Sequence, residues 1–221
     1  MPAAAATDAT IDEIRATLAP LIADNAAFDG WTNAALDAAA DAAGIDPDIA
    51  ALAFGGGAVD MIDAWFADVD RQMTEAVPAV ALGRMKVRAK VTALVEARLA
   101  AVADNRESLR RAMAILAMPQ NVVRAGKLGW RSVDTMWRLA GDTATDYNHY
   151  TKRAILGGVY AATVTVFLDD ESEDWADTRA FLARRIEGIM RFEKAKAGFT
   201  ARTANLPSFS RFIGRLRYPA V

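Results

Sequence analysis

Residues 134–168 read DTMWRLAGDTATDYNHYTKRAILGGVYAATVTVFL, and this stretch decides the expected fold. Before Gly141, large apolar residues recur every three to four positions, which predicts a helix that ends at this glycine. Thr143 and Asp146 have the spacing of a capping box, which predicts a second helix from there to about Leu168. The polar corner between the two helices, residues 141–153, either caps them or binds a partner.

The first 57 residues predict three short helices. The first should close at Gly30 and the second at Gly44, through a left-handed cap. The third should open with Asp46 as its N-cap and Pro47 at its first position. Three short helices with a tight turn between the second and third are organised like a helix-turn-helix module, and the glycine run 55–57 then breaks the chain.

Helical periodicity continues through the rest of the sequence. Helices are expected over about 58–77 and 80–102, then up to Pro119, and again from about Trp175. The helix 80–102 is basic and should bury Val87 on its apolar face. Because no alternating strand pattern is present, the sequence predicts an all-α protein.

The composition predicts a folded protein, and it includes few of the residue types that usually carry out catalysis. Hydrophobic residues make up 53% and charged residues 24% of the chain. There is no Cys, which excludes disulfides and zinc-thiolate sites, and the single His149 argues against a histidine-based metal site or a Ser–His hydrolase. No G-x-S-x-G or Walker sequence is present. We therefore expect no enzyme activity, no cofactor and no metal.

Charge is distributed unevenly along the chain. Residues 1–70 hold thirteen acids and one Arg, whereas residues 71–221 hold fifteen acids and twenty-five bases. A protein that grips DNA uses Lys and Arg to neutralise phosphates. The expected recognition helix, near residues 47–54, has neither. The helix-turn-helix module is therefore predicted not to bind nucleic acid.

The block 134–168 resembles the ubiquinone-biosynthesis accessory family, whose members are lipid-binding, tetracycline-repressor-like proteins that assist the hydroxylation of demethoxyubiquinone. The matching residues keep their spacing without gaps. They are Asp134, Met136-Trp137, Ala140-Gly141-Asp142, Thr145-Asp146, Asn148, Tyr150-Thr151, Arg153-Ala154 and Tyr160. The resemblance implies a tetracycline-repressor-like helical bundle with a degenerate helix-turn-helix, a lipid pocket and a homodimer.

The resemblance also implies that the corner and the helix before it dock the hydroxylase. The predicted partner-binding residues are Asp134, Met136, Asp146, His149, Tyr150 and Arg153. Position 149 departs from the family, which commonly has Trp there. The alternative is structural: Asp146 caps a helix, and Arg153 pairs with a nearby acid.

Small residues on the uncharged run 154–168 would let a long apolar ligand or another helix approach closely. The predicted lipid-binding residues are Trp137, Gly157, Gly158 and Ala161. The same pattern is compatible with an ordinary core helix, and the sequence leaves both interpretations open.

The tail 198–221 is basic and amphipathic, which is typical of helices that lie on a membrane surface. The predicted membrane-binding residues are Phe209, Arg211, Phe212, Ile213, Arg215 and Leu216. A final docking helix is the alternative.

We therefore expect three regions: a helix-turn-helix-like module over 1–57, a lipid-binding and dimerisation domain over 58–197, and the tail. The predicted function is non-enzymatic: to bind a polyprenyl quinone intermediate or a phospholipid at the membrane and present it to a demethoxyubiquinone hydroxylase-type enzyme. The alternative is a ligand-responsive transcriptional regulator. Residues 1–10 lack the basic segment of a secretion signal, so we expect a cytoplasmic protein, peripheral on the inner membrane.

Overall fold

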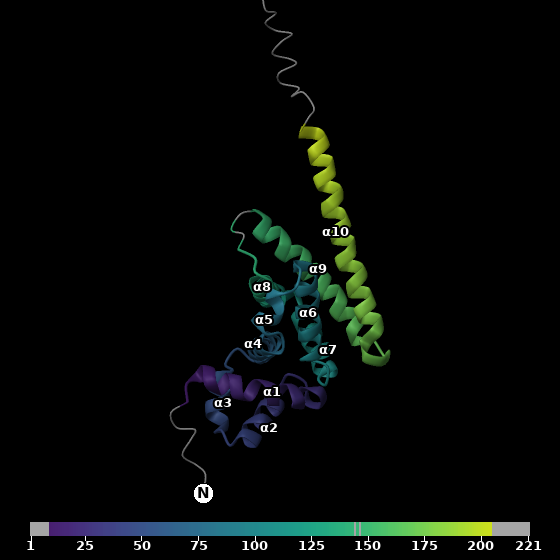
Figure 1. Cartoon of the computed structure of the whole chain (residues 1–221). Helices are drawn as coiled ribbons and strands as arrows, with labels where there is room; N and C mark the ends of the chain where they lie inside the picture. The colour runs from purple at the N-terminus through teal and green to yellow at the C-terminus, as the bar shows by residue number, and fades with distance from the viewer. Residues whose placement is uncertain (1–8, 144, 146, 205–221) are drawn as a thin grey trace, which may run out of the picture. The chain divides into compact units, whose positions relative to one another are not determined.

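The computed structural model describes residues 9–143, 145 and 147–204, and every regular element among them is a helix (Figure 1). This confirms the all-α prediction. The α-helices are α1 Ile11–Asp29, α2 Asn33–Ala43, α3 Pro47–Ala53, α4 Ala58–Ala76, α5 Ala79–Gly83, α6 Val87–Ala100, α7 Arg106–Leu116, α8 Val122–Leu139, α9 Tyr147–Leu168 and α10 Ala176–Ala204. Two short 3-10 helices, η1 Pro119–Asn121 and η2 Glu173–Trp175, precede α8 and α10.

The chain divides into two units, residues 1–182 and 183–221. The first holds α1 to α9 and the start of α10, and all the sites described below lie within it. The described part of the second unit, residues 183–204, continues α10.

The ends of the first three helices confirm the sequence prediction. Gly30 follows α1 with a φ of 70°, and Gly44 caps α2 in the left-handed conformation, at φ 66° and ψ 31°. Glycine adopts such angles more readily than any other residue, which explains why both helices end there. The Asp46 carboxylate accepts a hydrogen bond from the backbone N–H of Asp48 at 2.8 Å, and Pro47 is the first residue of α3.

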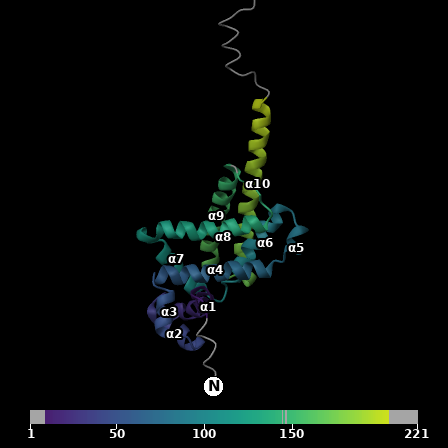
Figure 2. The ribbon, with the colours of Figure 1, turned by 90° about the vertical axis from the view of Figure 1, so that its left-hand side faces the viewer.

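Helices α1, α2 and α3 group together and pack on α4 and α7 (Figures 1 and 2). The rings of Trp31 and Trp65 lie 5.3 Å apart between these helices. The Trp31 indole N–H donates to the backbone carbonyl of Ser108 at 3.0 Å, so its polar atom is satisfied inside the core. The module thus shares its core with α4 and α7.

The prediction of a single helix over residues 80–102 is wrong. The chain forms α5, leaves helical geometry after Gly83, and begins α6 at Val87. Buried Leu82 anchors the short α5, whereas Val87 stands at the first turn of α6 and is 53% exposed. The periodicity was correct for the rest of α6, whose apolar face is buried from Val91 to Leu99.

The corner predicted from the block 134–168 lies between α8 and α9. Gly141 follows α8 with a φ of 90°, and α9 ends at Leu168 as expected. The proposed capping box falls partly on Asp146, which lies outside the described residues. Within the described residues no single helix has the length and apolar composition to span a membrane; α3 and α4, bent by 83° at the break between them, meet that test only as a pair.

Candidate ligand cavity and the corner between α8 and α9

A cavity of about 280 Å³ lies among α4, α6, α7, α8 and α9. Most of its lining is apolar. The lining residues are Phe66, Arg98, Leu109, Met113, Leu116, Ala117, Ala125, Gly129, Ser132, Val133, Gly157, Tyr160, Ala161 and Val164. Gly129 and Ala161 line the cavity and are also exposed to solvent, so the cavity is open on the side where α8 and α9 carry these small residues.

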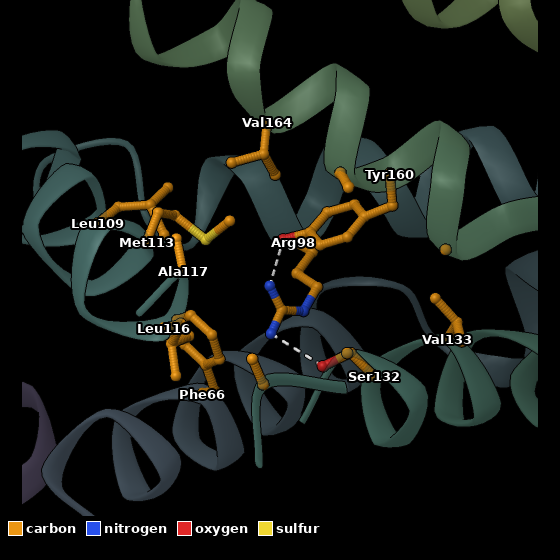
Figure 3. Close-up of a pocket in the computed structure, with 14 residues that line it drawn as sticks. Phe66, Arg98, Leu109, Met113, Leu116, Ala117, Ser132, Val133, Tyr160 and Val164 are labelled. Atoms are coloured by element: carbon orange, nitrogen blue, oxygen red, sulfur yellow. Dashed lines mark hydrogen bonds between the residues drawn. The ribbon is translucent and has the colours of Figure 1, made fainter. Parts of the chain in front are cut away.

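Three polar side chains gather at one place in this cavity. Figure 3 shows the Arg98 guanidinium between the Tyr160 hydroxyl and the Ser132 hydroxyl, with Leu109 and Met113 across the space. Arg98 donates to Ser132 Oγ at 3.0 Å and to the Tyr160 oxygen. Helices α6, α8 and α9 are thereby joined at the inner wall of the cavity.

Arg98 is only 1% exposed, and a buried charge is tolerated only when it is paired and hydrogen-bonded. Its Nε donates to Asp70 Oδ1 at 2.8 Å, and Ser132 Oγ donates to Asp70 Oδ2 at 3.1 Å. The guanidinium also faces the rings of Phe66 and Tyr160, 5.2 and 5.1 Å from their centres. These partners fix its orientation.

The predicted lipid-binding residues divide into two pairs. Gly157 and Ala161 line the cavity. Gly158 is exposed on another side of α9, and Trp137 lies at the corner, where its indole N–H donates to the Lys152 carbonyl at 3.1 Å. Arg98 was not among the residues predicted to bind a ligand. A signal existed: Arg98 follows Val91 and Leu94 at helical spacing, so the buried face of α6 carries a charge.

The corner between α8 and α9 is organised around Arg153. This residue is 2% exposed; its Nε lies 2.6 Å from Asp134 Oδ1, and its Nη1 lies 3.0 Å from Asp142 Oδ2. Lys152 Nζ pairs with the other oxygen of Asp142 at 2.7 Å. Although burial opposes the shift, the hydrogen bonds from Lys152 and Arg153 hold the pKa of Asp142 below its usual range. Arg153 therefore ties α9 to both α8 and the loop.

The predicted partner-binding residues do not all reach the surface. Met136 and Arg153 are buried, Asp134 is largely covered by its ion pairs, and Asp146 lies outside the described residues. His149 and Tyr150 reach the surface, and Tyr150 is 61% exposed. A partner can touch these two directly, whereas Met136 and Arg153 can only support the surface from below.

Trp130, His149 and Tyr150 form an aromatic cluster that the sequence analysis did not predict. The ring of Trp130, on α8, lies 6.3 Å from that of His149 and 6.0 Å from that of Tyr150. The rings of His149 and Tyr150 meet edge to face at 5.1 Å. A polar hollow of about 430 Å³ adjoins His149 and Tyr150 and includes Arg138, Asp142 and Arg153 in its wall.

The N-terminal module presents an acidic and apolar surface on α3. Asp48, Ile49 and Leu52 are exposed there. Over the described ranges, no group of three or more His, Asp or Glu side chains is placed to hold a metal ion.

The architecture is that of a tetracycline-repressor-like helical protein. A TetR transcriptional regulator from Nitrosomonas europaea superposes with a TM-score of 0.63, over 79% of this chain and 96% of the other, at 22% identity. This likeness confirms the predicted fold.

Sequence relatives identify the family. Residues 122–193 match the COQ9 family model. The rat mitochondrial ubiquinone biosynthesis protein COQ9 is 36% identical over 73% of this chain and 54% of its own length; for the human protein the values are 34%, 73% and 52%. The chain belongs to the COQ9 family, as the resemblance predicted. It spans about half the length of these two relatives.

Proposed function

We propose that this chain acts in ubiquinone biosynthesis as a non-enzymatic accessory protein. In this role it binds a polyprenyl quinone intermediate and presents it to a hydroxylase. The curated relatives are named as ubiquinone biosynthesis proteins, which supports the pathway. The observation that carries the proposal is the apolar cavity among α4, α6, α7, α8 and α9, with its polar groups collected at one place.

The size of the cavity limits what it can enclose. At about 280 Å³ it lies just below the usual range of small-molecule sites, roughly 300–1,000 Å³. A long polyprenyl chain would therefore be only partly enclosed and would continue through the open side, near Gly129 and Ala161. Partial enclosure suits a carrier that must release its ligand to an enzyme.

Presentation requires a docking surface near the opening. The cluster of Trp130, His149 and Tyr150 is a suitable candidate, because exposed aromatic side chains often dominate protein interfaces. Trp130 is one residue from Gly129, which lines the cavity. A hydroxylase docked on the cluster would thus lie close to the ligand.

The alternative, a ligand-responsive transcriptional regulator, receives no support from the module that would read DNA. Its exposed α3 side chains are acidic or apolar, and residues 16–70 contain no Lys or Arg. Phosphate neutralisation would have to come from elsewhere.

The proposal is tested by filling the cavity of the full-length protein. A Cβ on Gly157 would meet only Val133 Cγ1, at 3.9 Å, so Gly157→Leu should place its side chain in the cavity without a backbone clash. Gly126→Leu is the matched control, because Gly126 is also helical and has open space around it but does not line the cavity. Quinone bound from detergent solution is measured by mass spectrometry after gel filtration. Loss of binding in Gly157→Leu alone is expected; equal binding by both variants would refute the cavity as the site.

A further inference from the structure

Polar groups that still have a hydrogen to donate gather at the inner wall of the cavity. Arg98 carries five guanidinium hydrogens. One goes to Asp70, one to Ser132 and one to Tyr160. Among the described residues, no acceptor lies within hydrogen-bonding geometry of the remaining two. Because the Tyr160 oxygen accepts from Arg98, its own hydrogen is also left for another partner.

The Tyr160 hydroxyl is suited to remain a donor. Burial raises the pKa of this phenol, although the neighbouring Arg98 guanidinium acts in the opposite direction. The phenol therefore keeps its hydrogen at neutral pH. A ligand that reached this wall would meet N–H and O–H groups, and it would have to offer an acceptor atom to satisfy them.

The charges around this wall already balance. Asp70 pairs with Arg98 at 2.8 Å and lies 3.8 Å from Arg131 Nε, while Arg131 pairs with Asp63 at 2.5 Å. Two carboxylates thus face two guanidinium groups. An anionic head group would lose its hydration and approach Asp70 without an unneutralised cation to compensate it. An uncharged acceptor has no such cost.

We propose that the cavity selects apolar molecules carrying an uncharged hydrogen-bond acceptor, such as a quinone or ketone carbonyl, and holds that oxygen against Arg98 and Tyr160. This inference rests on the proposed use of the cavity and adds which end of the ligand enters it. The acceptor-bearing head lies inside, and the apolar tail leaves between α8 and α9.

Three probes, each with a six-membered ring and a hexyl chain, separate the contributions of the neutral acceptor, the apolar surface and the charge. Hexyl-substituted benzoquinone offers neutral acceptors, hexylbenzene offers none, and hexyl-substituted benzoate is anionic. Calorimetric titration of the full-length protein should show the quinone binding more tightly than both others. The quinone should have a dissociation constant about three- to ten-fold lower than that of hexylbenzene for each neutral hydrogen bond that it forms.

Tyr160→Phe removes one donor and keeps the ring. It should weaken quinone binding by about three- to ten-fold and leave hexylbenzene binding unchanged. Tyr150→Phe is the matched control, since Tyr150 is exposed and does not line the cavity, and it should bind all three probes as the wild type does.

The outcomes separate the two proposals. If wild type binds quinone and hexylbenzene equally, or Tyr160→Phe weakens both equally, the acceptor inference is wrong while the cavity remains a ligand site. If the benzoate binds most tightly, the charge argument is wrong. If no probe binds, both the inference and the proposed function fail. The comparison among probes on wild type needs no variant and stands even if Tyr160→Phe is unstable.

Discussion

The Nε of Arg153 lies 2.6 Å from Oδ1 of Asp134, and this ion pair joins α9 to α8 beneath the surface of the corner. The other oxygen of Asp134 is paired with Arg138 at the same distance. The two arginines differ in environment: the Arg153 side chain is 2% exposed and that of Arg138 is 73% exposed. One carboxylate therefore makes a buried and a solvated ion pair.

This difference gives a prediction about stability. Arg153→Leu should lower the free energy of unfolding by about 3–5 kcal/mol, because it leaves Asp134 and Asp142 without their buried partner. Arg138→Leu removes only the exposed pair and should cost at most about 1 kcal/mol. Urea denaturation of both variants measures the difference. Equal losses would show that the burial of Arg153 does not determine its contribution.

The docking surface is tested separately from the supporting ion pair. Tyr150→Ala and Trp130→Ala should each weaken binding to a demethoxyubiquinone hydroxylase by about 2 kcal/mol or more if the cluster is a hot spot. Binding is measured by surface plasmon resonance, with quinone content and thermal stability recorded for the same samples. Val123→Ala, an exposed apolar residue elsewhere on α8 with no place in the ring cluster, serves as the control. Unchanged affinity in both ring variants would exclude this surface.

The start of α10 predicts a dependence of stability on pH. Asp170 Oδ2 accepts from the backbone N–H of Thr178 at 2.8 Å, and Oδ1 accepts from that of Ser172 at 2.9 Å. Although burial opposes it, hydrogen bonding from Ser172 and Thr178 holds the pKa of Asp170 well below its usual range. A carboxylate whose pKa is depressed on folding stabilises the fold above its unfolded pKa, near 3.9. That contribution is lost as pH falls below this value.

Asp170→Asn should therefore lower the free energy of unfolding by about 1–2 kcal/mol at pH 6. The difference from wild type should shrink as the pH is lowered from about 4 towards 2, because Asp170 then protonates in the unfolded wild-type chain while it stays ionised in the folded one. Asp169→Asn is the control, because its side chain is 72% exposed. A difference between Asp170→Asn and wild type that stayed constant down to pH 2 would contradict the assignment.

The predictable parts of this fold are those encoded locally. Gly30, Gly44 and Asp46 mark helix ends because their own backbone or side-chain chemistry does so, whatever the rest of the chain does. The break at residues 84–86 was missed because a continuous apolar period hid it, although Gly83 stood at the point where α5 ends.

The site was less predictable because its polar centre is non-local. The charge of buried Arg98 is neutralised by Asp70, which is 28 residues away in the sequence and lies on another helix. The sequence does place each charge on the apolar face of its helix. Asp70 lies four residues after Phe66 on α4, and Arg98 lies four residues after Leu94 on α6. Two opposite charges on buried faces suggest a pair, but the spacing alone cannot say that they meet beside a cavity.

The helix-turn-helix module should not bind DNA. At low salt, where phosphate contacts are strongest, random duplex should migrate unshifted in a gel with the full-length protein. Leu52→Arg and Ile49→Lys place basic side chains on the exposed part of α3 and should retard the duplex in the gel. This result would show that the assay can detect binding there. Retardation of the duplex by wild type would favour the regulator hypothesis.

The last prediction concerns residues 205–221, the part of the basic tail 198–221 that lies outside the described residues. This segment has three Arg, at 211, 215 and 217, and no acid. Near an anionic membrane each basic residue contributes about 1 kcal/mol, an attraction that salt screens. Burial of Phe209, Phe212, Ile213 and Leu216 would add an apolar contribution that salt does not screen.

Truncation after Ala204 should abolish flotation with liposomes rich in anionic lipid and leave the melting temperature nearly unchanged. Phe212→Glu should weaken flotation at every ionic strength, whereas Arg211→Ala should do so mainly at low salt. If the truncated protein floats as well as full length, the tail is not the membrane anchor and docks elsewhere.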